Sequence, residues 1–319
     1  MLVKFSANIF VKPYKEKDLK VLITGGSGLI GKVLTQSLED AGHEVAILTR
    51  RLDSKSTVTQ YLWNPYRKEI DADALSDVEA IIHLAGANIA EKRWTKKRWE
   101  EMYSSRVDSA QFLYEKVKEY KIPLKSFISS SAIGWYGAGT SQEVYTEEAQ
   151  CADDILGALS LAWEAAADPF ADLGCSVSKV RTGIVLTNGG GALPKMMKPI
   201  LMGIGSPLGT GKQYMPWIHV DDICAIYVHL LEQKIPAGVY NGVAPESITN
   251  GDLTRLLAQV LHRPLWLPHV PSFVLKLIFG EMATILLNGS RVSANKLIEN
   301  GFQFKYPKTL EALEEIYGN

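Results

Sequence analysis

An apolar run meets a cluster of glycines in the segment Val21-Leu22-Ile23-Thr24-Gly25-Gly26-Ser27-Gly28-Leu29-Ile30-Gly31. The apolar run predicts a buried parallel strand, and residues with helical spacing follow the glycines directly. Gly25, Gly28 and Gly31 have the spacing G-x-x-G-x-x-G. Glycines at such places permit a tight strand-to-helix turn, let a pyrophosphate approach the backbone and let the helix pack closely. Three glycines alone also fit an ordinary turn, but the strand before them and the helix after them favour a dinucleotide site at Gly25, Ser27, Gly28, Leu29, Ile30 and Gly31.

Strand and helix patterns alternate along the chain from this segment onward. Short apolar strands are predicted at residues 20–24, 44–48, 59–63, 80–84, 125–129 and 176–181, and helices at residues 29–41, 96–120 and 156–171. Gly42 stands where the first of these helices is expected to end. This alternation predicts an α/β fold in which helices cover both faces of a doubly wound parallel sheet, the Rossmann arrangement.

The pattern changes after Gly183. Residues 192–217 are rich in Gly, Pro and Met with little periodicity, and a helix with an aspartate cap is predicted at residues 223–231. We expect an N-terminal extension at residues 1–18, a nucleotide-binding Rossmann domain at 19–187 and a smaller C-terminal α/β substrate lobe at 188–319. Residues from about 218 to 245 are expected to complete the Rossmann domain, and residues 1–18 fit either an edge strand or an extended arm.

The composition is that of an ordinary globular protein of 319 residues, 46% of them hydrophobic and 22% charged. A formal net charge of −1 gives no electrostatic reason to expect nucleic acid or an anionic membrane as a partner. Cys151, Cys175 and Cys224 are far apart, so neither a disulfide framework nor a metal site is predicted. No convincing signal peptide or membrane-spanning run is found, and the expected location is the cytoplasm.

The residues at the end of the second predicted strand indicate which nicotinamide cofactor would fit. Sites that prefer NAD usually place an Asp or Glu there to hold the ribose 2′-hydroxyl. Here Thr49 takes that place, and Arg50 and Arg51 follow. Threonine does not repel a 2′-phosphate, and arginine offers it a bidentate, charge-assisted contact. The sequence therefore predicts NADP(H), with two solvated surface arginines as the alternative interpretation.

Further motifs follow in a fixed order along the chain. They are the strand end Leu84-Ala85-Gly86, the serine strand Ser129-Ser130-Ser131 leading to Tyr136-Gly137, and the segment Val220-Asp221-Asp222. Together with the glycine segment, they resemble the extended branch of the short-chain dehydrogenase/reductase superfamily, the branch of sugar-nucleotide epimerases and dehydratases. Closer matches to an atypical group labelled epimerase family proteins are Leu84-Ala85-Gly86-Ala87-Asn88-Ile89, Lys92-Arg93-Trp94, Ser105-Arg106 and Pro216-Trp217-Ile218-His219. The resemblance spans residues 20 to about 315 and implies no particular substrate.

The resemblance also implies a catalytic set: a serine, followed on the next helix by a tyrosine and a lysine spaced Y-x-x-x-K. Ser131 matches the serine, but Leu156 and Ser160 occupy the tyrosine and lysine places, and neither exchanges a proton near neutral pH. The one Y-x-x-x-K pair, Tyr114 and Lys118, precedes the serine strand and is read as a coincidence. Tyr136 is the tyrosine that follows the serine strand most closely, so Ser131 and Tyr136 are the catalytic candidates.

The same resemblance extends the candidate cofactor site. Leu84, Ala85, Gly86 and Ser129 stand at ends of predicted strands, where ligands bind in open α/β sheets. Arg106 aligns with a position that faces the cofactor, where it would hold a phosphate or else form a surface salt bridge. Arg181 and Gly183, at the end of the strand at 176–181, are expected near the nicotinamide for the same reason.

Two functions fit these residues. The first is an NADP(H)-binding oxidoreductase or epimerase-like enzyme acting on a small molecule, with a nucleotide-linked substrate as one option. The second is a non-catalytic NADP(H) binder, a sensor or scaffold, which the loss of the Tyr–Lys pair favours. The retained C-terminal lobe favours the enzyme. A monomer and a homodimer fit the sequence equally well.

Overall fold

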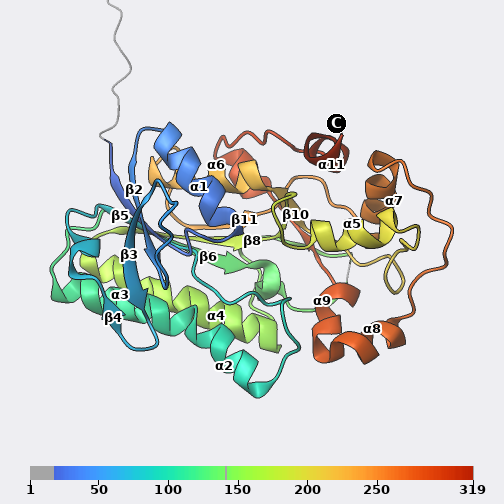
Figure 1. The fold of residues 1–319 in the computed structure, drawn as a ribbon, viewed down its shortest axis with the longest axis horizontal. Helices are drawn as coiled ribbons and strands as arrows, with labels where there is room; N and C mark the ends of the chain where they lie inside the picture. Colours follow the sequence, from blue (N-terminus) through green and yellow to red (C-terminus); the bar gives the residue numbers. More distant parts are fainter. Residues whose placement is uncertain (1–17, 141, 319) are drawn as a thin grey trace, which may run out of the picture.

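An eight-stranded sheet runs through the centre of the structure, a computed structural model that describes residues 18–140 and 142–318. The strand order is β11-β8-β6-β5-β1-β2-β3-β4, and every neighbouring pair is parallel except β3 and β4 (Figure 1). The strands are β1 (Lys20–Thr24), β2 (Glu44–Thr49), β3 (Thr59–Asn64), β4 (Glu69–Ile70), β5 (Ala80–His83), β6 (Ser126–Ala132), β8 (Ser176–Thr182) and β11 (Val239–Gly242). The N-terminal extension expected at residues 1–18 lies, apart from Asp18, outside the described residues.

Helices cover both faces of this sheet, so the predicted doubly wound α/β fold is confirmed (Figure 1). Alternate residues of each strand point to opposite faces. Val21 and Ile23 pack with α1 (Leu29–Asp40) and α6 (Val220–Leu231), and Leu22 packs on the other face with α3 (Val107–Glu119). Burial of both faces explains why the strands are almost uniformly apolar.

The remaining elements form the C-terminal lobe and the connections. The helices are α2 (Lys96–Ser104), α4 (Ile155–Ala167), α5 (Leu193–Leu201), α7 (Asn250–Val260), α8 (Ser272–Phe279), α9 (Thr284–Leu287), α10 (Asn295–Glu299) and α11 (Thr309–Tyr317). Short 3₁₀ segments are η1 (Ala72–Leu75), η2 (Ile133–Tyr136), η3 (Asp168–Leu173) and η4 (Gly280–Ala283). Two small sheets pair β9 (Ile184–Leu186) with β10 (Trp217–His219) and β7 (Val144–Tyr145) with β12 (Arg291–Val292). None of the helices among the described residues has the length and apolarity needed to cross a membrane.

Three predicted helices have different bounds in the structure. The helix expected at residues 156–171 is α-helical only to Ala167 and continues as η3. The helix expected at residues 96–120 is divided into α2 and α3, because Ser105 and Arg106 turn toward the loop that follows β5. The helix expected at 223–231 begins earlier, at Val220, and His219 caps it by accepting a hydrogen bond from the Asp221 amide. The expectation of an aspartate cap is therefore wrong.

A buried ion pair joins α4 to β8. Glu164 is the single charged residue of α4, and its carboxylate accepts hydrogen bonds from Arg181 Nε (2.8 Å) and Nη2 (3.1 Å). The two side chains are 5% and 3% exposed. Removing one partner from such a pair leaves an uncompensated buried charge, which is costly.

Glu164→Ala is therefore expected to lower the free energy of unfolding by about 3 kcal/mol or more, measured by urea denaturation. The control is Asp168→Ala, because Asp168 and Lys179 link the same segments at the surface, with Asp168 64% exposed. That change should cost no more than about 1 kcal/mol. Equal losses in the two variants would contradict the buried-pair argument.

His83 links the ends of β1 and β5 to the start of α3. Thr24 Oγ1 donates to His83 Nδ1 at 2.9 Å, and His83 Nε2 donates to the Arg106 carbonyl at 3.2 Å. This pattern requires the neutral ring protonated at Nε2, because a carbonyl can only accept. Burial lowers the pKa of His83 from 6.5 to about 4, although the hydrogen bond to Arg106 acts in the opposite direction.

The unfolded chain therefore binds a proton on His83 at a higher pH than the folded chain. The stability contributed by neutral His83 is complete above pH 6.5 and is lost as the pH falls toward 4, by up to about 3 kcal/mol. Urea denaturation of the wild type and of His83→Asn across this range should show a smaller pH dependence in the variant. His262→Asn, at an exposed histidine, should behave as the wild type; parallel curves for all three proteins would contradict the assignment.

Candidate functional site

The order of the strands reverses between β1 and β5, which creates a crevice at their carboxyl ends. The turn after β1 is packed against the end of β5. Gly25 has φ +72°, and a Cβ there would lie 2.9 Å from the Leu84 carbonyl carbon. A Cβ at Gly31 would lie 2.6 Å from Gly26 Cα, so α1 starts directly on this turn. Glycine is required at both positions because no side chain has room.

The first turn of α1 faces the crevice with its amide groups uncapped. Gly28 is the N-cap residue, no side chain caps the helix, and the first turn contains no acidic residue. Ser27 and Gly28 are exposed, and a Cβ at Gly28 would meet only the Gly25 carbonyl oxygen, at 3.0 Å. Free amides and the positive end of the helix dipole favour an anion. The turn therefore fits a pyrophosphate.

A second glycine-rich segment, residues 189–191, approaches this turn from the C-terminal lobe. Side chains added at Gly190 and Gly191 would lie 3.3 Å and 3.1 Å from the methyl groups of Leu29. Lys195 on α5 donates to the Ala90 carbonyl at 3.2 Å, across the same crevice. This segment was not among the site residues predicted from the sequence, although its three consecutive glycines were a signal for it.

The end of β2 carries the two arginines expected to select the cofactor. The Thr49 hydroxyl donates to the Arg51 carbonyl at 2.9 Å, which fixes a local turn. Arg50 and Arg51 are exposed, and within the described part of the chain neither guanidinium forms a hydrogen bond or salt bridge, although Arg50 interacts electrostatically with Glu101. Both side chains are therefore available to a ligand.

Other candidate cofactor residues have structural partners instead. Arg106 is 8% exposed, donates to the carbonyls of Met102 and Ala87 at 3.0 Å each, and lies over the Trp163 ring. Burial lowers its pKa to about 10, so it stays charged at neutral pH. In this structure Arg106 supports the loop that contains Gly86 and forms no surface salt bridge with a described residue, and its contact with a phosphate stays a prediction.

Ser129, Arg181 and Gly183 are also enclosed. The Ser129 hydroxyl donates to the Ser130 carbonyl, and Arg181 is bound to Glu164. A Cβ at Gly183 would lie 2.7 Å from the Pro216 carbonyl oxygen. The residues that border the crevice are instead Gly25, Ser27, Gly28, Leu29, Ile30, Leu84, Ala85 and Gly86, each exposed or half-buried.

Ser131 and Tyr136 belong to one buried polar network. Ser131 Oγ donates to Glu164 Oε1 at 2.7 Å, and the Tyr136 hydroxyl donates to Asn241 Oδ1 at 2.6 Å while accepting from Arg181 Nη1 at 3.1 Å. Burial raises the pKa of the Tyr136 phenol, and the hydrogen bond from Arg181 offsets part of this rise. Tyr136 is thus held as a protonated donor. A lone carboxylate in the apolar helix α4 was the signal that could have revealed Glu164.

Leu156 and Ser160, the residues at the expected dyad positions, provide no acid or base. Ser160 Oγ donates to the Leu156 carbonyl at 2.9 Å. Leu156 lines a cavity of about 430 Å³ between the two lobes, together with Trp94, Ala138, Asp154, Ile155, Glu281 and Thr284. His219, from the motif Pro216-Trp217-Ile218-His219, caps α6 and hydrogen-bonds Glu315 at 3.0 Å. Its role in the structure is therefore to hold the helix.

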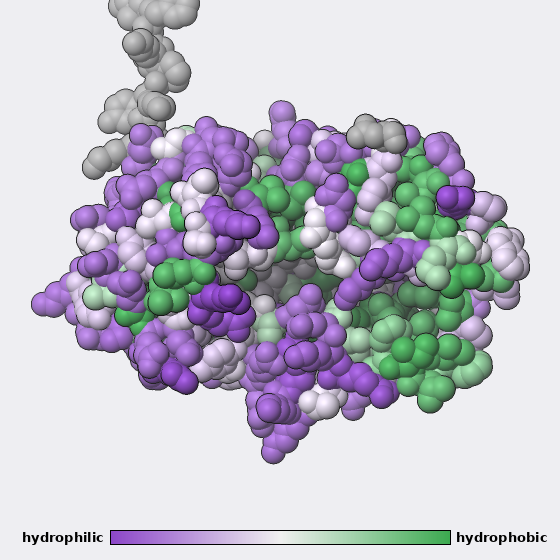
Figure 2. Space-filling view, viewed as in Figure 1, coloured by the Kyte–Doolittle hydropathy of each residue, from purple (hydrophilic) through white to green (hydrophobic). Residues whose placement is uncertain are grey.

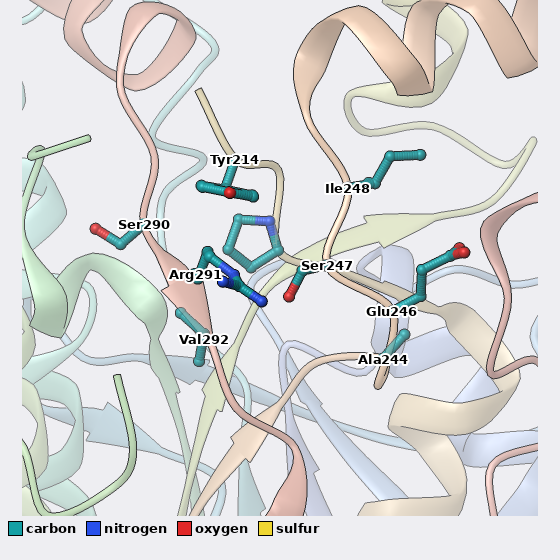
Figure 3. A pocket seen from close by; sticks show the side chains of 9 residues that line it. Tyr214, Ala244, Glu246, Ser247, Ile248, Ser290, Arg291 and Val292 are labelled. Carbon is teal, nitrogen blue, oxygen red and sulfur yellow. The ribbon is translucent and has the colours of Figure 1, made fainter. Parts of the chain in front are cut away.

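A second pocket lies within the C-terminal lobe and is very small (Figure 3). Tyr214, Glu246, Ser247 and Arg291 line it, and its volume of about 10 Å³ has room for about one water molecule. Arg291 lies over the Tyr214 ring, 5.4 Å from its centroid. This pocket is too small for a substrate.

Sequence comparison finds relatives over nearly the whole chain. The profile of the NAD dependent epimerase/dehydratase family matches residues 21–241, and that of a domain of unknown function (DUF1731) matches residues 270–316. The human epimerase family protein SDR39U1 is 35% identical over 302 residues, which cover 93% of this chain and 99% of the relative. The Staphylococcus saprophyticus epimerase family protein SSP1921 is also 35% identical, covering 92% of this chain and 98% of that protein.

Solved structures give the same result. The crystal structure of human SDR39U1 (isoform 2) with NADPH has a TM-score of 0.84 and 33% identity, and covers 94% of this chain and all of that one. UDP-glucose 4-epimerase from Thermotoga maritima, solved with UDP-glucose, matches with a TM-score of 0.76. The match covers 94% of this chain and 98% of that one, and at 20% sequence identity it shows a shared fold. The resemblance inferred from the motifs is thus confirmed, and the chain belongs to the NAD dependent epimerase/dehydratase family.

Proposed function

We propose that this protein binds NADP(H) in the crevice between β1 and β5 and is an atypical oxidoreductase or epimerase-like enzyme. The observation that carries the proposal is the pairing of an uncapped α1 N-terminus with two free arginines at the end of β2. The first group fits a pyrophosphate, and the second fits a 2′-phosphate. The NADPH bound by human SDR39U1, which is 33% identical, supports the same cofactor here.

When bound, the nicotinamide would supply hydride transfer. The chain would contribute Ser131, which matches the serine of the superfamily; its hydroxyl proton is donated to Glu164, so it would reach a substrate oxygen only by exchanging that hydrogen bond. Because both the proton and a lone pair of the Tyr136 hydroxyl are engaged, we assign Tyr136 a positioning role, through Arg181. Leu156 occupies the position of the superfamily's tyrosine, so the site lacks the usual proton donor. For this reason a non-catalytic NADP(H) sensor is the second candidate function.

Other parts of this proposal rest on the sequence. We retain the division into a cofactor domain at residues 19–187 and a substrate lobe at 188–319. Its support is that β11, from within the second range, joins the large sheet beside β8. A cytoplasmic location and a monomer or homodimer also remain predictions.

The cofactor assignment is tested by titrating the protein with NADPH and NADH while following cofactor fluorescence. The wild type should bind NADPH more tightly, and Arg50→Ala should weaken NADPH binding by about tenfold to hundredfold, the loss of one charge-assisted contact, without changing NADH binding. Arg67→Ala, at another exposed arginine, serves as the control. Equal affinities of Arg50→Ala and wild type for NADPH would contradict the 2′-phosphate argument.

Turnover is tested by incubating NADPH-loaded protein with ketones, aldehydes and sugar nucleotides and following NADPH absorbance. On a substrate that reacts, Ser131→Ala should lower kcat by about a hundredfold. Ser130→Ala should stay within about twofold, because alternate strand residues face opposite sides of the sheet. Tyr136→Phe should lower kcat but leave the shape of the pH–rate profile unchanged. NADPH binding with no oxidation by any compound would favour the sensor, and a changed pH profile would make Tyr136 an acid or base.

A further inference from the structure

The cavity beside Leu156 lies between the two lobes of the molecule. Trp94 comes from the loop after β5, Ala138 from the loop after η2, and Asp154, Ile155 and Leu156 from the start of α4. Glu281 in η4 and Thr284 in α9 close it from the C-terminal lobe. At about 430 Å³ it falls within the range of small-molecule sites.

The walls of this cavity are apolar and aromatic. Trp94 and Leu156 belong to a cluster with Leu159, Met102 and Met282, which are buried where the lobes meet. The Trp94 indole N–H donates to the Ile89 carbonyl at 2.9 Å, and Trp99 packs edge-on against the indole at a centroid distance of 4.8 Å. With its N–H satisfied and its ring fixed, Trp94 contributes an apolar aromatic wall.

The charged groups of the cavity are both acidic. Asp154 is committed to the backbone: its carboxylate accepts hydrogen bonds from the amides of Ala138, Leu156 and Gly157. Glu281 is exposed and, among the described residues, has no hydrogen-bond or ion-pair partner. No residue lining the cavity is basic. The nearby Arg93 donates to the Leu277 carbonyl at 3.2 Å and lies outside the lining.

We propose that this cavity binds the substrate and selects a largely apolar, uncharged or cationic compound rather than a nucleoside diphosphate sugar. The proposal rests on the proposed function and names its substrate class. A pyrophosphate needs cations or free amides, and here it would meet the unpaired carboxylate of Glu281 and the already saturated cap of α4. Apolar surface from both lobes is instead available to a ring or a branched chain.

The cations that could still favour a nucleotide are Arg93, whose guanidinium lies beside Gly280 and binds the Leu277 carbonyl, and Arg291. Arg291 lies on β12, next to Ser290, which donates to the Gly139 carbonyl and so connects this strand to the loop that contains Ala138. Its guanidinium covers Tyr214 in the pocket of about 10 Å³, which has no room for a phosphate. Figure 2 shows the hollowed face of the molecule, where apolar side chains gather on the side of α8 and α9. A nucleotide bound at Arg291 would therefore require this small pocket to widen.

The test uses NADPH-loaded protein and three probes: 4-phenyl-2-butanone (neutral), benzyltrimethylammonium (cationic) and UDP-glucose (anionic). Calorimetry should detect binding of the first two and none of UDP-glucose. Leu156→Trp fills the cavity and should weaken binding of both apolar probes by at least about tenfold. The control is Leu161→Trp on the same helix, where Leu161 is 50% exposed, and this variant should bind as the wild type.

A substitution at Glu281 provides a second, independent test. Glu281→Lys should weaken benzyltrimethylammonium binding by about fivefold and leave the neutral ketone within about twofold, because the substitution reverses a charge at the rim. Tight UDP-glucose binding that Arg291→Ala abolishes would overturn the proposal, as would apolar probes that bind equally well to Leu156→Trp.

NADPH affinity is measured on the same samples by cofactor fluorescence. Loss of NADPH binding with intact probe binding would reject the proposed function and leave the cavity assignment standing. Intact NADPH binding with no probe binding would reject the cavity assignment alone.

Discussion

The absence of room for a Cβ between β1, α1 and the end of β5 is the constraint on which the rest of the site depends. At Gly25 a positive φ and the nearby Leu84 carbonyl together require glycine, and at Gly31 the helix lies directly on its own entry turn. This close packing places the amides of the first turn of α1 at the carboxyl edge of the sheet with no side chain in front of them. The crevice, the loop after β5 and the glycine segment at 189–191 are all arranged around that turn.

A second organising feature is the polar network under the serine strand. In the arrangement that the superfamily resemblance implies, a tyrosine and a lysine on α4 face the cofactor, whereas here Leu156 and Ser160 present an apolar wall and a satisfied hydroxyl. One turn after Ser160 on α4, Glu164 accepts hydrogen bonds from both Ser131 and Arg181. The charged residue of α4 therefore lies behind the serine, where it binds Ser131 and Arg181, and Leu156 gives the cavity an apolar wall.

These two features together describe the kind of site the chain has retained. The groups suited to a dinucleotide are the backbone amides at the start of α1 and the exposed arginine side chains after β2, and none of them has to act as an acid or base. The neighbouring cavity combines aromatic and aliphatic walls with one unpaired carboxylate at its rim. Such a site distinguishes ligands by shape and by sign of charge. It differs in that respect from a site built to hold a diphosphate.

Local sequence by itself determined the fold class, the glycine turn and the free arginines at the end of β2, because backbone sterics and the period of apolar residues act over a few positions. It also determined that the dyad is missing, since that needs only residue identity. The partners of Arg106, Arg181 and His219 were decided by the tertiary structure. Arg181 donates hydrogen bonds to Glu164 on α4 and to Tyr136 on η2. His219 forms a hydrogen bond with Glu315, almost a hundred positions later in the chain. The sequence around an arginine at a strand end is the same whether its side chain contacts a ligand or a buried carboxylate. Which of the two it contacts depends on packing between residues far apart in the chain.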